Sequence, residues 1–156
     1  MNRLLTSAIT LTLISTTSIA ATDKQPLEQI NFVKKVYMMA VSDKYMGVDI
    51  LKQNSSSELK QLLSRRDTIA LRHNGEMCEW VRNVLIPGND YDVRVNQMKF
   101  SALSNGLIRA QGKNFGESFQ VDFKVQCDGQ NCQIDDIYIP DSYKKEVMSI
   151  IKNNQC

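Results

Sequence analysis

Two adjacent acidic residues, Asp135 and Asp136, are the side chains in this sequence that best suit acid–base chemistry. The surrounding apolar residues predict a strand, and adjacent residues of a strand point to opposite faces. The two carboxyl groups are therefore not expected to form a dyad, and only one of them can point into an interior. The interpretation that we favour leaves one carboxylate in solvent and gives the other a backbone hydrogen bond or an arginine partner such as Arg109.

No motif for covalent catalysis accompanies these acids. His73 is the only histidine, and it is expected at the end of a helix, just before Asn74 and Gly75. A histidine there is more often solvated, or stabilised by the helix dipole, than catalytic. The chain has no G-x-S-x-G motif, and its cysteines are all expected in disulfides. The sequence therefore assigns no catalytic residue and predicts no cofactor.

The four cysteines predict two disulfides. Cys127 and Cys132 bracket Asp128-Gly129-Gln130-Asn131, a sequence typical of a turn, so we expect them to pair across a hairpin neck. That leaves Cys78 to pair with Cys156, a long closure that contributes on the order of 4 kcal/mol in the loop-entropy model. The alternative is a metal site, but this spacing with a single histidine matches zinc sites poorly, and no metal is predicted.

Residues 1–20 resemble a secretory signal peptide. They combine a short positive start, a modest apolar run and small residues before a break at Ala20 or Ala21. The run is too short and too rich in Thr and Ser to span a membrane, and no cysteine near the break offers a site for a lipid anchor. We therefore expect residues 21–156 to form a single domain that is periplasmic or secreted, without a membrane anchor.

The charge balance argues against nucleic acid as a partner. The full chain of 156 residues has 19 basic and 17 acidic side chains, and Arg3 is the only charged residue of the expected signal peptide. A mature protein this close to neutrality has no global field that would attract a polyanion. Arg65 and Arg66 form only a pair, not a basic tract.

Hydrophobic periodicity predicts helices first and strands later, which is typical of an α+β domain. Two N-terminal helices are expected, the second of which begins with Ser55 as N-cap and Glu58 in a capping box. Four antiparallel strands follow, with a bulge at Asn96 and Gln97 in the first, and then a C-terminal helix capped by Asp141. The expected ranges are 26–41 and 56–73 for the helices, 91–100, 107–110, 119–125 and 134–139 for the strands, and 141–152 for the last helix. The N-terminal helices should pack on a curved four-stranded sheet.

This arrangement resembles the nuclear-transport-factor-2-like fold, a cystatin-like α+β cone, and within it a group of small exported bacterial domains without a shared activity. The resemblance rests on the runs 32–40, 57–63 and 132–137, the last of which contains Ile-Asp-Asp-Ile. Cys132 stands where members of the group tend to have an aromatic residue. In related folds an inward aspartate in an apolar pocket can serve as a general base, which makes Asp135 or Asp136 the candidate here.

Two functional hypotheses follow. The first is an exported protein-binding or inhibitor module, such as an immunity-type protein that blocks a toxin or a cell-wall enzyme, with a protein partner in the envelope. Phe115, on a turn, is a candidate anchor for such an interface. The alternative is a small-molecule pocket in the cone, serving a carrier or an isomerase-like or hydrolase-like enzyme. Its candidate lining residues are Asp135, Asp136, Tyr37 and Trp80, although Tyr37 also fits the core and Trp80 fits packing around the Cys78 disulfide.

Overall fold

The structure of this chain is a computed structural model that describes residues 24–45, 49–73, 78, 80, 82–88 and 90–156. The signal peptide expected over residues 1–20 therefore lies outside the described residues. The elements are α1 (Lys24–Ala40), the 3-10 helix η1 (Asp43–Tyr45), α2 (Ile50–Gln53), α3 (Ser57–Arg72), the 3-10 helix η2 (Val95–Gln97), β1 (Lys99–Ala102), β2 (Ile108–Asn114), β3 (Glu117–Asp128), β4 (Asn131–Tyr138) and α4 (Tyr143–Asn153). This order confirms the predicted α+β class.

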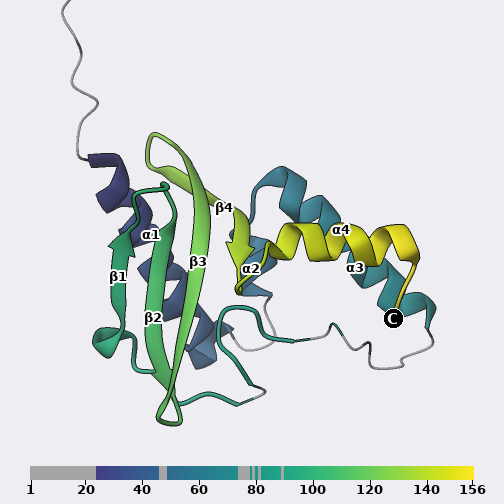
Figure 1. The fold of residues 1–156 in the computed structure, drawn as a ribbon, viewed down its shortest axis with the longest axis horizontal. Coiled ribbons are helices and arrows are strands. Elements are labelled where there is room, and N and C mark those ends of the chain that lie inside the picture. The colour runs from purple at the N-terminus through teal and green to yellow at the C-terminus, as the bar shows by residue number, and fades with distance from the viewer. Residues whose placement is uncertain (1–23, 46–48, 74–77, 79, 81, 89) are drawn as a thin grey trace, which may run out of the picture.

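The four strands form one antiparallel sheet in the order β1-β2-β3-β4 (Figure 1). Each strand pairs with the next along the chain, as a meander of hairpins predicts. β1 is short and pairs with β2 only from Lys99 opposite Gln111 to Ala102 opposite Ile108. β2 and β3 stay paired as far as Asn114 opposite Glu117, so their hairpin extends past the start of β1.

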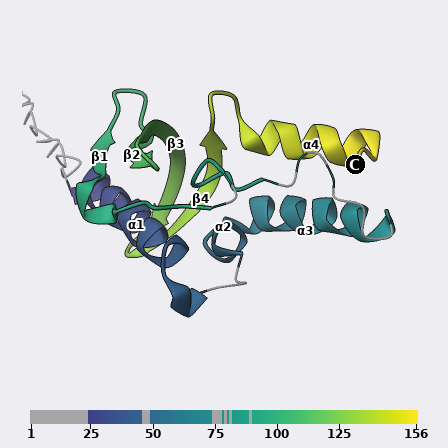
Figure 2. The same ribbon diagram turned by 90° about the horizontal axis from the view of Figure 1, so that it is seen from below.

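Helix α1 lies in the hollow of the curved sheet (Figure 2). The ring of Tyr37, which is fully buried, lies 5.9 Å from Phe100, 6.4 Å from Phe119 and 5.9 Å from Phe123, measured between ring centroids. Its hydroxyl donates a 2.8 Å hydrogen bond to the carbonyl of Leu85, which satisfies the one polar atom of this side chain. The concave side of the curved sheet is thus filled by a helix and aromatic rings.

Helices α3 and α4 both begin beside β4 and extend away from the sheet side by side (Figures 1 and 2). Ser55, just before α3, forms a parallel bridge with Ile134. Ser142 caps α4, and its hydroxyl accepts the amide hydrogen of Lys145 at 3.1 Å. Two helix N-termini therefore meet at the same strand.

The far ends of these helices are fastened by a second, smaller apolar cluster. It contains Ile69, Cys78, Trp80 and Ile150, with Cys156 packed against it. The indole of Trp80 donates to the carbonyl of Gln155 at 3.1 Å. The structure confirms both predicted disulfides, Cys78–Cys156 and Cys127–Cys132, and the packing of Trp80 around the first of them.

The predicted length of the first strand and the predicted N-caps of two helices were wrong. The strand expected over 91–100 is limited to β1, because residues 95–97 turn as η2 where a bulge was predicted. Ser56, not Ser55, caps α3, and Ser142, not Asp141, caps α4. In both cases neighbouring residues could cap, and contacts with β4 select the residue that does.

Candidate functional site

A β-bulge changes the direction in which the side chains of the acidic pair, Asp135 and Asp136, point. β3 and β4 pair Lys124 with Asp136 and Val125 with Ile134, so Asp135 is an extra residue without a partner. Ile134 and Ile137 can then both face the core although they are three residues apart. Asp135 and Asp136 are both buried, at 5% exposure each, and both contact the start of α4. The strict alternation assumed from the sequence does not hold here.

Asp135 is held by cations. One carboxylate oxygen accepts from Lys124 Nζ at 2.7 Å, and the other accepts from Lys144 Nζ at 3.2 Å. The hydroxyl of Ser56, the N-cap of α3, lies 3.5 Å from the second oxygen. Burial alone would raise the pKa of Asp135, but the hydrogen bonds and charges of the two lysines outweigh it and hold this pKa below its ordinary value. A general base with a raised pKa is the opposite of what these contacts produce.

Asp136 joins β4 to α4. One of its carboxylate oxygens accepts the amide hydrogens of Ile137 at 2.8 Å and Lys144 at 2.9 Å. The other accepts from the hydroxyl of Ser142 at 2.6 Å. A carboxylate placed on free amide hydrogens at a helix N-terminus is stabilised by both the hydrogen bonds and the helix dipole. Asp136 is therefore a capping residue supplied by another element.

The lowered pKa of Asp135 predicts the direction of a pH effect on stability. Because the folded-state pKa lies below the unfolded value of about 3.9, its ion pairs contribute fully above that value and are lost as the pH falls through the folded pKa. We expect Asp135→Asn to be less stable than the wild type at pH 7, and the difference to shrink on acidification. Urea unfolding between pH 7 and pH 2.5 measures it. Asp128→Asn, at the exposed end of β3, is the control, and a constant difference for Asp135→Asn would contradict the assignment.

The four residues predicted to line a pocket are not brought together. Tyr37 lies in the core on α1, and Trp80 lies in the smaller cluster. Asp135 and Asp136 belong to β4, and their side chains contact Lys124 of β3 and Lys144 at the start of α4. Arg109, suggested as an aspartate partner, pairs with Asp122 through two 2.8 Å hydrogen bonds. The small-molecule alternative, which needed an apolar cavity with one convergent carboxylate, gains no support from these contacts.

A polar hollow between the helices and the loop over residues 82–88 and 90–91 contains cations that are already neutralised. It has a volume of about 320 Å³, and Arg66, Arg82 and Tyr143 are among its lining residues. The guanidinium of Arg66 donates to Asp67 and to the hydroxyl of Tyr143, and that of Arg82 donates to Glu146 at 2.6 Å. Each arginine thus has an acidic partner, so these contacts describe a structural network.

The tip of the β2–β3 hairpin carries an unusual aromatic residue. Asn114 and Glu117 are paired, so Phe115 and Gly116 alone form the turn, with φ angles of 48° and 87°. Two positive φ values are those of a type I′ turn, which favours Asn-Gly. A bulky side chain in the left-handed region is disfavoured by roughly 1 kcal/mol or more. Nevertheless Phe115 stands there with 66% of its surface exposed.

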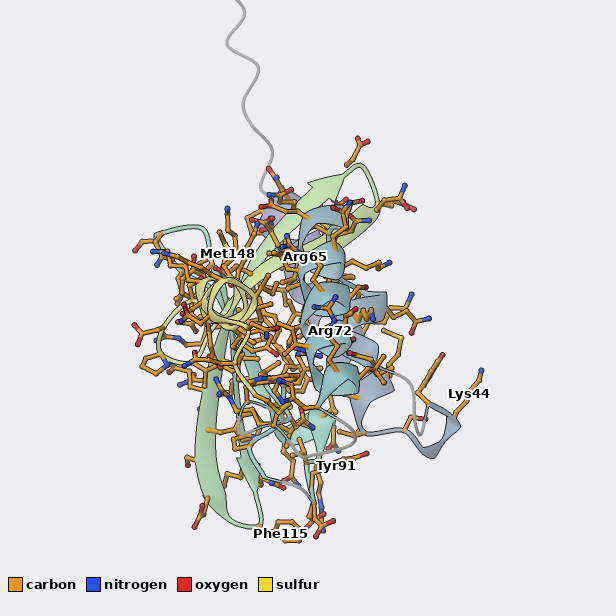
Figure 3. All side chains as sticks on the ribbon, turned by 90° about the vertical axis from the view of Figure 1, so that its right-hand side faces the viewer. Lys44, Arg65, Arg72, Tyr91, Phe115 and Met148 are labelled. Atoms are coloured by element: carbon orange, nitrogen blue, oxygen red, sulfur yellow. A yellow bond between two sulfur atoms is a disulfide. The ribbon has the colours of Figure 1, made fainter. Side chains whose placement is uncertain are left out.

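This tip is held rigidly by Asn114. Its side-chain oxygen accepts the amide hydrogen of Asp92 at 2.8 Å, and its nitrogen donates to the carbonyls of Pro87 at 2.7 Å and Asp90 at 3.1 Å. The loop before η2 is therefore fastened under the hairpin. Tyr91, 43% exposed, belongs to this loop and lines the hollow that also contains Arg66 and Arg82 (Figure 3).

We call Phe115 and Gly116 together the tip surface. It presents one exposed aromatic side chain on a hairpin that Asn114 fastens to the loop before η2. Sequence reasoning found Phe115 from its position on a turn, but it missed the role of Asn114, whose partners lie more than twenty residues away. Aromatic residues in such positions are typical anchors of protein interfaces.

No protein family, curated protein or solved structure matches this chain. Within the described residues, no helix is both long and apolar enough to cross a membrane. In the same part of the chain, no group of three or more His, Cys, Asp or Glu side chains is arranged to hold a metal ion. The candidate site therefore rests on the geometry of the tip surface.

Proposed function

We propose that this chain is an exported protein-binding or inhibitor module that contacts a protein partner in the envelope through its tip surface. The observation that carries the proposal is Phe115, an exposed aromatic residue in the left-handed region on a hairpin that Asn114 fastens. Strained residues persist where the surrounding structure holds them, and they concentrate at functional sites. In the proposed interface, burial of the Phe115 ring by the partner offsets the cost of this conformation.

Other features support the compartment and the manner of binding. Two disulfides suit an oxidising space such as the periplasm, in line with the signal peptide predicted at residues 1–20. The curved sheet around α1 supports the proposed likeness to the nuclear-transport-factor-2-like fold. A projecting hairpin with an aromatic tip also suits entry into a cleft, so an immunity-type inhibitor of a toxin or a cell-wall enzyme is the specific form that we propose.

Capture from an envelope extract of the native cell tests this function. The immobilised mature protein is compared with Phe115→Ala and with Met148→Ala, a control that removes another exposed apolar side chain, 52% exposed on α4 (Figure 3). We expect Phe115→Ala to weaken binding of the captured protein about 30-fold, as for a central anchor residue, and Met148→Ala to have no effect. Equal binding by all three proteins would contradict the proposal.

A further inference from the structure

The sheet has a step at the edge next to the tip surface. Pairing of β1 with β2 ends at Lys99 opposite Gln111, but β2 continues to Asn114 against β3. The chain before Lys99 turns away as η2, so within residues 90–156 the outer edge of β2 at Lys113 has no strand partner. An open hollow of about 620 Å³ lies at this step, and Gly116 of the tip surface is one of its lining residues.

One side of the step is apolar and closely packed. A Cβ atom on Gly112 would lie 2.9 Å from Cζ of Phe119 and 3.1 Å from Cγ of Met98, which is too close. The absence of a side chain at Gly112 therefore lets the Phe119 ring and Met98 lie directly against the backbone of β2. Both residues line the hollow; Met98 is buried, and the half-buried ring of Phe119 offers an apolar surface beside the unpaired strand edge.

The other side of the step is cationic. Lys113 follows Gly112 in β2, so its side chain lies on the face of the sheet opposite to Phe119, the partner of Gly112. Gln111 lies on the same face as Lys113. Lys99 pairs with Gln111, so its side chain lies on that face too. Both lysines are exposed and line the hollow together with Arg94. Asp92 is its only acidic lining residue, and none of the three cations is in an ion pair among the described residues.

These charges select the kind of strand that can enter. Lysines at a sheet edge oppose pairing with another copy of the same edge, because like charges would meet. They favour a segment with acidic side chains. An exposed edge that meets an extended segment gains main-chain hydrogen bonds, while alternate side chains determine specificity.

We propose that this step binds an extended acidic segment of the protein partner. The backbone of that segment pairs with Lys113, because alternate residues of β2 point their N–H and C=O groups to opposite edges and those of Gly112 point toward β3. Its acidic side chains face Lys99 and Lys113, and its apolar side chains face Phe119. The inference rests on the proposed function, because the step adjoins the tip surface and deepens the same interface. It specifies the partner chemistry that Phe115 alone does not.

A short peptide tests the step without the partner. The probe is acetyl-Glu-Val-Glu-Val-Glu-amide, and its counterpart has lysine in place of each glutamate. Amide signals of Gly112 and Lys113 in the ¹⁵N-labelled mature protein report binding. We expect saturable shifts with the acidic peptide only. The double variant Lys99→Glu/Lys113→Glu should weaken binding about tenfold, whereas Lys60→Glu/Lys145→Glu, with the same change of net charge on exposed helix positions, should not.

Backbone pairing has its own control. Alternate residues of a strand present their N–H groups to opposite edges, so methylating the nitrogens of either the valines or the glutamates should abolish binding, and methylating the other set should not. Absence of saturable shifts, equal binding of the lysine peptide, or indifference to both methylations would overturn the inference. If the peptide fails while capture still depends on Phe115, the step is wrong and the proposed function stands. If the peptide binds while capture ignores Phe115, the proposed function is wrong.

Discussion

Replacing Asp136 with alanine is expected to destabilise the protein by about 3 kcal/mol, the largest effect that we expect of a single substitution. The change leaves the amide hydrogen of Lys144 and the hydroxyl of Ser142 without their acceptor, in a place that is almost fully buried. It also removes a negative charge from the N-terminus of α4. Thermal unfolding should show a Tm lower by about 10 °C.

Two further variants separate the capping contact from a general effect of charge. Asp136→Asn keeps one acceptor oxygen and should lose about half as much stability. Asp141→Ala removes a neighbouring exposed carboxylate that makes no side-chain hydrogen bond among the described residues, so it should change stability by less than about 0.5 kcal/mol. If Asp136→Ala and Asp141→Ala had equal effects, Asp136 would not be the tertiary cap described here.

Phe115→Asn is expected to make the protein more stable and to remove partner binding at the same time. Asparagine tolerates the left-handed region and suits the first turn position before Gly116, so relief of the strain should add about 1 kcal/mol and raise the Tm by about 3 °C. The aromatic anchor is lost in the same step, so affinity for the partner should fall as in Phe115→Ala.

The alanine variant serves as the control for this combination. Alanine also lacks the ring but, having a Cβ and no amide, gains little in the left-handed region. Phe115→Ala should therefore lose binding without the rise in Tm. A stability gain with unchanged binding in Phe115→Asn would show that the exposed ring serves no interface, and a loss of stability would show that the ring supports the fold.

The sequence predicted those features that depend on local pattern. The disulfide Cys127–Cys132 follows from a four-residue turn, and Cys78–Cys156 follows from elimination once the first pair is assigned. The turn at Phe115 and Gly116 was also predictable from its glycine. Its conformation was not, because phenylalanine is disfavoured at positive φ and only contacts made by Asn114 hold the turn in place.

The acidic pair shows the limit of periodicity. Alternation places Asp135 and Asp136 on opposite faces, and this holds only for a regular strand. At the bulge, the Asp135 side chain contacts Lys124, Lys144 and Ser56, which come from three other parts of the chain. No local signal in the sequence around Asp135 distinguishes a bulged strand from a regular one, so a structural role for both carboxylates could be recognised only in three dimensions.

Photo-crosslinking from position 115 in the native envelope tests the central claim most directly. A benzophenone amino acid replaces Phe115 in one protein and Met148 in another, so that two exposed apolar positions on opposite parts of the molecule are compared (Figure 3). We predict one discrete crosslinked protein from position 115 and no crosslink to that protein from position 148. An absence of crosslinks from position 115, or the same products from both positions, would contradict it.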